Sequence, residues 1–523
     1  MTHTSQAELF ARSFQSQVAR NPGAACLTVP MLRALGVRDT VNDLCSSGHT
    51  VPHGNIVEVL VTNRLQAPRP LYKVQDWLEQ TALESALAVQ AEHVHDTRLG
   101  ETLDAVHPQY QAIWQKVVLA GVRQFRLPLD WLHYDITSTY FEGAYSESDL
   151  VTFGYSRDKR PDTKQLNIGL TTMHNGIPLA FAVLVGKTAD LTTPRQNMEA
   201  VYKLVPAAQT SDLIIVHDRG MATAETLIWY EQHHQRFVSP VTADSALQAV
   251  LDAIPAAELM AQPLDYQPQR ARGGAAPGYY GVWREHMVTH NGQSARFRLL
   301  VVHSVGKARL DAQKRQTLLD KLLRRLAEIQ EQLNQRKYKR RAYTLEQIHL
   351  ALRGNAAQDL VDISLSGDDG QLVFTYRVKG EKLAQAEQRD GRYPLLTNDW
   401  ELGADDVLGH FKEEDQIEKR FWVLKGPLQI HPMWLHKDER LVSLVLILMI
   451  ALLIYCLLEH LVRQAQRYLT GRALLDAFAS CTVVLLRFAD GSQVWTYPQL
   501  TALQVDLLAA LDLPSPQATL MLA

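Results

Sequence analysis

The feature that most restricts how this chain can fold is an uninterrupted apolar run near its C-terminal end. Residues 441 to 458, LVSLVLILMIALLIYCLL, contain no charged side chain. A run of this length reaches the lower limit for a membrane-spanning helix, but a helix enclosed within a large domain has the same composition. Charges border the run closely, at Lys437 and Arg440 before it and at Glu459 and Arg463 after it. We therefore expect a helix buried in a protein core, with a single membrane span as the alternative.

Length and composition fit an ordinary globular protein. The chain has 523 residues, 46% of them hydrophobic and 21% charged, and a net charge of −3. This length allows about two to four folding units. The first residues, MTHTSQAELFARS, lack the basic and apolar regions of a signal peptide, and none of the four cysteines forms a CxxC pair. Both observations favour a cytoplasmic location with free or buried thiols.

The hydrophobic spacing changes several times along the chain. Residues 1–122 have mostly helical spacing, and residues 123–240 alternate strands with a helix, which predicts an α/β fold with a mixed sheet. Residues 241–400 interrupt that pattern, and residues 401–470 return to helices that include the apolar run. Residues 471–523 form a tail with a helix, a hairpin and a last helix, and they indicate no function.

The interrupting segment contains two expected hairpins and one long helix. The hairpins are AAPGYYGVWREHMVTHNGQSARFRLLVVHS and VDISLSGDDGQLVFTYRV, the second with a DDG turn. The helix is expected over residues 307–341, with an apolar stripe and twelve Lys or Arg against four acids. Its apolar positions are Leu318, Leu322, Leu326, Ile329 and Leu333.

Two aspartates stand where ligands gather in α/β sheets. Asp135 lies in or beside a strand in LHYDITS, and Asp218 ends the strand LIIVHDRG. An aspartate in such a place also serves to cap a helix or turn the chain. Asp190 and Glu142 are further acidic candidates near this site. Asp190 is better explained by a loop or hydrogen-bonding role, and Glu142 by its place at the end of a strand.

A third carboxylate lies on an expected helix over residues 411–425, FKEEDQIEKRFWVLK. Glu418 borders its apolar side, and Lys425 follows two turns later on a similar face. Three carboxylates from two strands and one helix are the minimum apparatus for two Mg²⁺ ions, which prefer oxygen ligands. The chain has neither the HExxH spacing of a zinc site nor a GxxxxGK[ST] phosphate loop.

Several segments, taken in order, resemble one known family. YDITSTYFEG, GYSRDKRPDTKQLNIGL, LIIVHDRGM and IEKRFWVLK are similar to motifs of the DDE transposases of bacterial insertion sequences, in the group with a Tyr-Arg-Glu-Lys signature. DGRYPLLTN, PMWLHKDERL and the N-terminal VPMLRALGV…GNIVEVLVTNRLQAPRPLY fit the same group. Together these segments cover most of the chain.

The resemblance implies an RNase H-like catalytic core interrupted by an insertion domain, with a helical N-terminal leader domain that is a candidate for DNA binding. It matches Asp135, Asp218 and Glu418 to the catalytic residues that hold two Mg²⁺ ions, or Mn²⁺ in their place. It matches Lys425 to the signature lysine, which contacts phosphate. The signature tyrosine falls on Phe411 and the arginine on Glu414, so phosphate contacts are not carried over to that end of the helix.

The activity implied is metal-dependent cleavage of DNA at the ends of an insertion sequence, followed by strand transfer into target DNA. The implied partners are double-stranded DNA, namely terminal inverted repeats and target, and a second copy of the chain in the DNA complex. The resemblance implies no membrane and a cytoplasmic enzyme that is nucleoid-associated when bound to DNA. The alternatives are a transposase-derived DNA-binding protein without catalysis and, further off, a single-span membrane protein.

Two groups of basic residues are candidates for DNA contact, with a solvated charged face as the alternative for each. The first follows Asp135 in sequence and comprises Arg157, Lys159, Arg160 and Lys164. The second is expected at the end of the long helix and comprises Arg336, Lys337, Lys339, Arg340 and Arg341.

Overall fold

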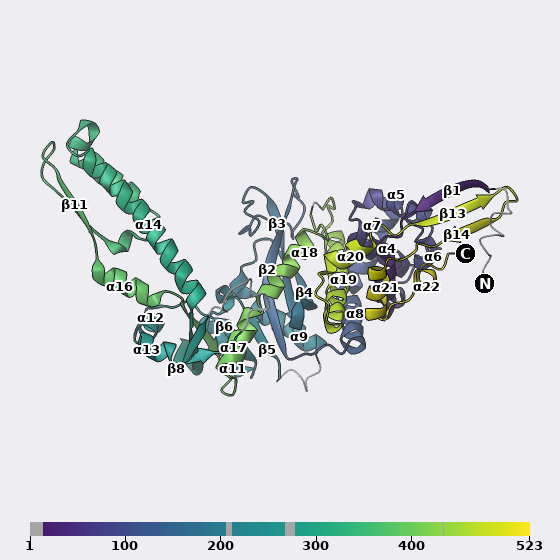
Figure 1. The fold of residues 1–523 in the computed structure, drawn as a ribbon, viewed down its shortest axis with the longest axis horizontal. Helices are drawn as coiled ribbons and strands as arrows, with labels where there is room; N and C mark the ends of the chain where they lie inside the picture. Colours follow the sequence, from purple (N-terminus) through teal and green to yellow (C-terminus); the bar gives the residue numbers. More distant parts are fainter. Residues whose placement is uncertain (1–13, 206–211, 267–277, 432, 523) are drawn as a thin grey trace. The chain divides into compact units, whose positions relative to one another are not determined.

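A computed structural model describes residues 14–205, 212–266, 278–431 and 433–522 of the chain (Figure 1). Its backbone divides into two compact units. The core unit comprises Met1–His217 and Glu413–Ala523, and the insert unit comprises Asp218–Lys412. The division into five segments that the sequence suggests, from 1–122 to 471–523, stays a prediction about domain organisation.

A mixed sheet forms the centre of the core unit. Its strands lie in the order β4-β3-β2-β5. They are β2 (Trp131–Phe141), β3 (Lys164–Met173), β4 (Ile177–Val185) and β5 (Ile214–His217). β3 pairs antiparallel with both β2 and β4, whereas β5 runs parallel to β2. The β3–β4 hairpin turns where the sequence HNG predicts, because Asn175 and Gly176 take φ values of 61° and 70°.

The apolar run forms most of helix α19 (Asp438–Gln464), which packs against β4 and against helices α4, α7 and α8. It is the one helix of the described residues that is long and apolar enough to cross a membrane, and 94% of its most apolar window is buried. The prediction of a buried core helix is therefore confirmed.

The N-terminal part of the core unit is mostly helical, as its spacing predicts. The helices are α2 (Ala25–Ala34), α3 (Val37–Leu44), α4 (His53–Gln66), α5 (Val74–Glu79), α6 (Glu84–Leu87), α7 (Asp96–Val106) and α8 (Tyr110–Gln124). Helix α4 is buried along nearly its whole length, because α19, α3 and α7 all pack against it. Two further core helices, α9 (Pro194–Leu204) and α18 (Asp415–Lys425), pack against β4 and β2 respectively.

The tail contains the helix, hairpin and helix that its sequence predicts. These are α20 (Gly471–Phe478), β13 (Val483–Phe488) with β14 (Gln493–Thr496), and α21 (Ala502–Ala510), followed by α22 (Pro516–Leu520). The sequence does not predict β1 (Phe14–Arg20), which pairs antiparallel with β13 from the other end of the chain.

The insert unit has its own strands, in the order β6-β12-β9-β8-β7. They are β6 (Arg236–Pro240), β7 (Pro263–Leu264), β8 (Tyr279–His290), β9 (Gln293–Ser304) and β12 (Arg392–Thr397). Helices α11 (Ala224–Gln232), α12 (Ser245–Asp252), α13 (Ala256–Met260), α16 (Gly380–Arg389) and α17 (Ala404–Lys412) accompany them. Both expected hairpins are present, β8 with β9 and β10 (Val361–Ser366) with β11 (Val373–Val378).

The long helix of the insert unit is shorter than predicted. α14 spans Val305–Glu331, not 307–341, and a short turn (Arg336–Lys339) and helix α15 (Arg341–Leu352) follow (Figure 1). The helix stops because Asn334 is left-handed, with φ of 62°, and its side chain exchanges two hydrogen bonds with the backbone of Leu372. Leu322, Leu326 and Ile329 are buried as expected, but Leu319 is buried in place of Leu318.

The helix expected over 411–425 is also interrupted. α17 ends at Lys412 and α18 begins at Asp415, so Phe411 belongs to the insert unit and Glu418 to the core unit. Phe411 packs near Tyr393 of β12, with 5.8 Å between the ring centroids. The two signature positions at Phe411 and Glu418 therefore do not share one continuous helix.

Candidate active site

The parallel pairing of β2 with β5 relates the two aspartates. Trp131 pairs with Ile214 and, three positions on, Tyr134 pairs with His217. Paired residues of parallel strands direct their side chains to the same face of the sheet. Asp135 is the next residue of β2, and Asp218 directly follows the end of β5. The backbone therefore brings both aspartates to equivalent positions, at the carboxyl end of β5.

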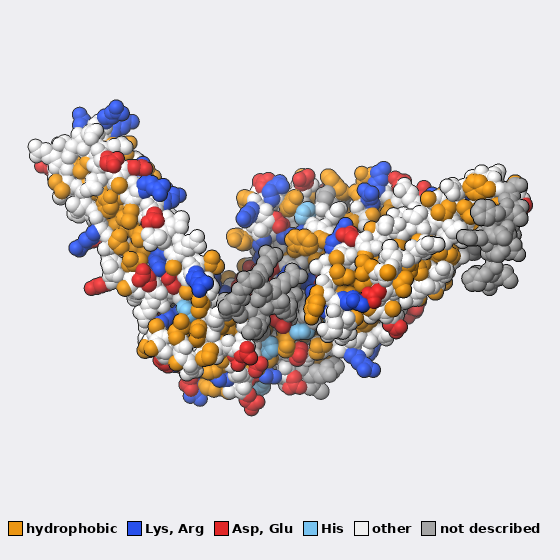
Figure 2. All heavy atoms as spheres, viewed as in Figure 1, with side chains coloured by type: hydrophobic (Ala, Val, Ile, Leu, Met, Phe, Trp, Pro, Cys, Tyr) orange, Lys and Arg blue, Asp and Glu red, His pale blue; other side chains and the backbone are white. Residues whose placement is uncertain are grey.

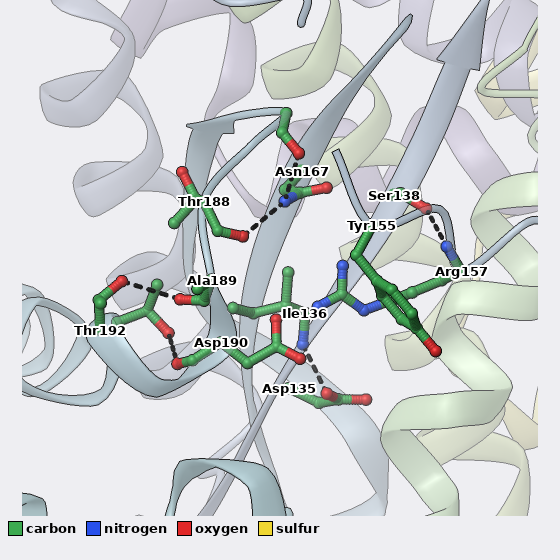
Figure 3. Close-up of polar contacts among 12 residues, drawn as sticks. Asp135, Ile136, Ser138, Tyr155, Arg157, Asn167, Thr188, Ala189, Asp190 and Thr192 are labelled. Carbon is green, nitrogen blue, oxygen red and sulfur yellow. Dashed lines mark hydrogen bonds and ion pairs between the residues drawn. The ribbon is translucent and has the colours of Figure 1, made fainter. Parts of the chain in front are cut away.

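Each aspartate also makes the local hydrogen bond that its sequence context allows. The half-buried Asp135 accepts at Oδ1 from the backbone N–H of Ile136, at 2.7 Å (Figure 3). The exposed Asp218 accepts from the backbone N–H of Arg219, at 2.5 Å, and caps the turn Arg219–Met221. A capping role and a ligand role use different oxygens of a carboxylate and do not exclude one another.

Helix α18 runs along β2 in the same direction. Just before the helix, Glu413 accepts a hydrogen bond of 3.1 Å from the indole N–H of Trp131, at the start of β2. At the end of the helix, Lys425 Nζ lies 2.5 Å from Oδ1 of Asp158. The other oxygen of Asp158 accepts from the hydroxyl of Ser138, at 3.4 Å. Because Trp131 and Ser138 flank Asp135 on β2, the middle of α18 lies level with Asp135.

Glu418 is in that middle part of α18 and its side chain is exposed. Among residues 14–205, 212–266, 278–431 and 433–522, however, no three His, Cys, Asp or Glu side chains form a group that could hold a metal ion. Asp135, Asp218 and Glu418 are therefore not among such groups, and their assignment as metal ligands stays a prediction. Carboxylates of like charge avoid one another unless a cation lies between them. Their oxygen donors are nevertheless of the kind that Mg²⁺ and Mn²⁺ prefer.

The beginning of α18 is held by a charged pair. His174 Nδ1, in the β3–β4 turn, lies 3.2 Å from Oε2 of Glu413, and its ring meets that of Trp131 edge to face. This contact raises the pKa of His174 above its ordinary value. Burial, the largest single influence, would raise the pKa of Glu413, but His174, His133 and the indole N–H of Trp131 together lower that pKa below its ordinary value. The imidazolium and the carboxylate thus stabilise each other's charged forms.

Most of the basic residues predicted near Asp135 are occupied by partners within the core unit. Arg157 forms an ion pair with Asp190 (Figure 3), and Arg160 forms an ion pair with Asp162. Lys164 donates to the backbone carbonyl of Tyr145, at 2.8 Å. Lys159 is exposed, with φ of 58°. Asp190 thus has the hydrogen-bonding role that its sequence context favours.

The sequence gives no signal for Asp158 as the partner of Lys425. Asp158 lies between two residues singled out for their positive charge, Arg157 and Lys159, and only the tertiary structure brings it to α18. His431 lies close by, with its ring centroid 4.9 Å from that of Tyr140, and burial lowers its pKa. A phosphate that binds Lys425 would share its ammonium group with Asp158 or compete with Asp158 for it.

The second basic group differs from the first because its side chains are not paired with carboxylates of the described residues. Arg336, Lys337 and Lys339 lie in the turn after α14, and Arg340 and Arg341 lead into α15. All five side chains are exposed, and none forms an ion pair with another residue of the part of the chain described. Lys and Arg side chains gather at this end of α14 (Figure 2). Arg341 Nη1 donates to the carbonyl of Gly367, at 3.1 Å, but none of the five side chains is paired with a described carboxylate, so the group is available to an external anion, whereas Arg157, Arg160 and Lys425 are already paired with carboxylates.

Comparisons with known proteins give two findings. A family model described as Domain of unknown function (DUF4277) matches residues 26–119, in the N-terminal helices. The chain is also similar to a solved structure titled as a cryo-EM structure of the piggyBac transposase synaptic complex with hairpin DNA. The likeness has a TM-score of 0.38 at 9% identity and covers 89% of this chain and 83% of that one. It is too distant to carry an argument about this chain. The comparison with curated proteins gives no match.

Proposed function

We propose that this protein is a DDE-type transposase, which cleaves DNA at the ends of an insertion sequence and joins those ends to target DNA. The observation that carries the proposal is the parallel register of β2 and β5, which gives Asp135 and Asp218 equivalent positions, with Glu418 level with Asp135 on α18. Three of the motifs that resemble the family, YDITSTYFEG, LIIVHDRGM and IEKRFWVLK, cover most of these three elements.

In this proposal Asp135, Asp218 and Glu418 hold two Mg²⁺ ions, or Mn²⁺ in their place. Bound ions supply the activation of a water or 3′ hydroxyl and the stabilisation of the leaving oxygen. The chain's own residues bind and orient the DNA. Lys425 contacts a phosphate near the cut, and the exposed basic group from Arg336 to Arg341 neutralises the backbone of the duplex.

The proposal includes the core and insertion architecture of the family, a homodimer on DNA and a cytoplasmic location with association to the nucleoid. Its partners are the terminal inverted repeats and the target DNA. The competing candidate is a transposase-derived DNA-binding protein without catalysis. It is favoured by one observation, that no three of the described carboxylates form a metal-holding group.

A nicking assay separates the two candidates. The substrate is supercoiled plasmid that carries the DNA flanking the gene on both sides, incubated with the protein and Mg²⁺ or Mn²⁺. Wild type should nick the plasmid at the element ends, and Asp135→Asn should abolish nicking while DNA affinity in a gel-shift assay stays near normal.

Asp130→Asn is the matched control for that variant. Asp130 precedes β2 and accepts a 2.9 Å hydrogen bond from the backbone N–H of Trp131, just as Asp135 does from Ile136. Both variants lose one charge and keep the local hydrogen bond, so only loss of a metal ligand distinguishes them. Equal nicking by both variants would refute Asp135 as a catalytic residue, and DNA binding without nicking by wild type would favour the competing candidate.

A further inference from the structure

The most apolar helix of the protein contains a buried carboxylate with a buried arginine against it. Glu459, directly after the apolar run of α19, is only 4% exposed, and Arg420 of α18 is 3% exposed. Arg420 Nη1 donates to Oε2 of Glu459, at 2.7 Å. The site proposed above assigns no role to either residue.

The remaining donors of Arg420 meet the hairpin turn between β3 and β4. Nε donates to the carbonyl of Gly176, at 3.0 Å, and Nη2 to the carbonyl of Asn175, at 2.6 Å. A Cβ on Gly176 would lie 2.7 Å from Nε of Arg420, so glycine is needed there for the approach as well as for its φ of 70°. The second oxygen of Glu459 accepts from the backbone N–H of Gly471, at 2.8 Å. One guanidinium therefore ties α18 to the turn of the central sheet and to α19.

Stability alone does not explain such a pair. Replacing a buried ion pair by apolar residues of similar volume is often neutral or stabilising, because charges lose hydration when they are buried. A guanidinium, unlike an apolar side chain, has donors in a fixed planar fork and so requires its partners at defined angles. Bound to three acceptors on two elements, Arg420 fixes both the height and the rotation of α18.

Glu418 precedes Arg420 by two residues on the same helix. Two residues correspond to about 200° of rotation and about 3 Å of rise, so a side chain two positions from a buried one points to the opposite side. Arg420 accordingly faces the interior while Glu418 is exposed. The other ties of α18, at Glu413 and Lys425, lie at its two ends and are less buried.

We propose that Arg420 and Glu459 are positioning residues that hold α18 in the rotation at which Glu418 can join Asp135 in binding metal. The inference rests on the proposed function. In this inference the charged pair orients α18, which an apolar pair of equal volume would not do.

The test replaces both charges together, as Arg420→Met with Glu459→Leu. The control is Arg440→Met with Asp104→Leu, which removes an arginine–carboxylate pair between α19 and α7, with hydrogen bonds of 2.8 and 2.7 Å. Each protein is measured for its melting temperature, DNA affinity, cleavage rate at saturating DNA and Mg²⁺, and Mn²⁺ affinity by titration without DNA.

We expect the Arg420/Glu459 double variant to melt below wild type, because the carbonyls of Asn175 and Gly176 and the N–H of Gly471 lose their partners, but to fold and to bind DNA normally. Its cleavage rate and Mn²⁺ affinity should each fall by about tenfold to a hundredfold, the usual effect of losing a residue that orients a ligand. The control pair should leave both unchanged. Arg420→Lys keeps the positive charge but lacks the planar guanidinium, so its cleavage rate and Mn²⁺ affinity should lie between those of the double variant and wild type. This single variant serves as the test if the double variant does not fold.

Wild-type cleavage and Mn²⁺ affinity in the double variant, or in Arg420→Lys if that variant carries the test, would overturn the inference. Glu418→Gln in the same assays distinguishes this from a failure of the proposed function. If Glu418→Gln also cleaves and binds Mn²⁺ as wild type does, the assignment of Glu418 is wrong. If Glu418→Gln loses both while the double variant keeps both, the positioning role alone is wrong.

Discussion

Lys425 and Asp158 form an ion pair with 2.5 Å between Nζ and Oδ1, and both side chains are largely buried. The family resemblance assigns Lys425 to phosphate, and in this structure a carboxylate of the chain has taken that place. The pair joins the end of α18 to the loop that follows β2, and it makes the availability of Lys425 depend on Asp158.

Asp158→Asn should therefore strengthen DNA binding. Removing the negative charge leaves Lys425 to a DNA phosphate, so we expect affinity to rise by about twofold to tenfold and the slope of log affinity against log salt to steepen by roughly one unit. Asp149→Asn is the control, since it loses the same charge at an exposed position of the same loop. Fluorescence anisotropy over a salt series measures both, and equal gains in the two variants would mean that only net charge matters.

Replacing Arg336, Lys337, Lys339, Arg340 and Arg341 by alanine should weaken DNA binding. These side chains are exposed and lack an ion-pair partner in the described part of the chain, so the salt slope should flatten by roughly one unit for each phosphate that is no longer neutralised. Arg325→Ala with Arg377→Ala is the control, because both arginines are already paired, with Glu328 and Asp362. An unchanged slope in the variant with all five replacements would show that the group is only a solvated face.

The pair of His174 and Glu413 predicts how stability depends on pH. The pKa of His174 is raised above 6.5 in the folded chain, so its contribution is complete below pH 6.5 and is lost as pH rises through the folded value. The pKa of Glu413 is lowered below 4.5, so its contribution is present above pH 4.5 and is lost as pH falls through the folded value. The pair therefore stabilises the core unit most between those two values.

His174→Gln should thus lower the melting temperature at about pH 5.5 and have a smaller effect at about pH 9, where wild type has lost the charge. The exposed His233→Gln in the insert unit serves as the control and should shift neither value. A loss of stability from His174→Gln that is equal at both pH values would assign His174 a packing role without a charge effect.

Burial of the apolar run predicts the effect of a cavity within it. Leu448 of α19 is fully buried, so Leu448→Ala should lower the free energy of unfolding by about 2–5 kcal/mol. Leu310→Ala in α14 is the control, because Leu310 is exposed and should cost little. Denaturant unfolding followed by tryptophan fluorescence compares the two. A cost for Leu448→Ala no greater than that for Leu310→Ala would contradict a packed environment around α19.

Local signals in the sequence were sufficient for much of the fold. The apolar run of 441–458 forms a buried helix, the HNG turn joins β3 to β4, and the hairpins of the insert unit lie where alternation and turn residues predict them. Each of these depends on residues close together in the chain, so hydrophobic periodicity and turn chemistry were enough to predict them.

The tertiary structure alone decided the rest, because interactions between distant residues leave no local pattern. The helix predicted to 341 stops at Glu331, where Asn334 bonds to Leu372 of another segment, and β1 is a strand because β13 pairs with it. Asp158 as the partner of Lys425, and Arg420 as the buried tie between α18, the β3–β4 turn and α19, are likewise set by chain segments far apart in sequence. The sequence by itself determined which acids resemble a catalytic set, whereas their orientation depends on how α18 is held against the sheet.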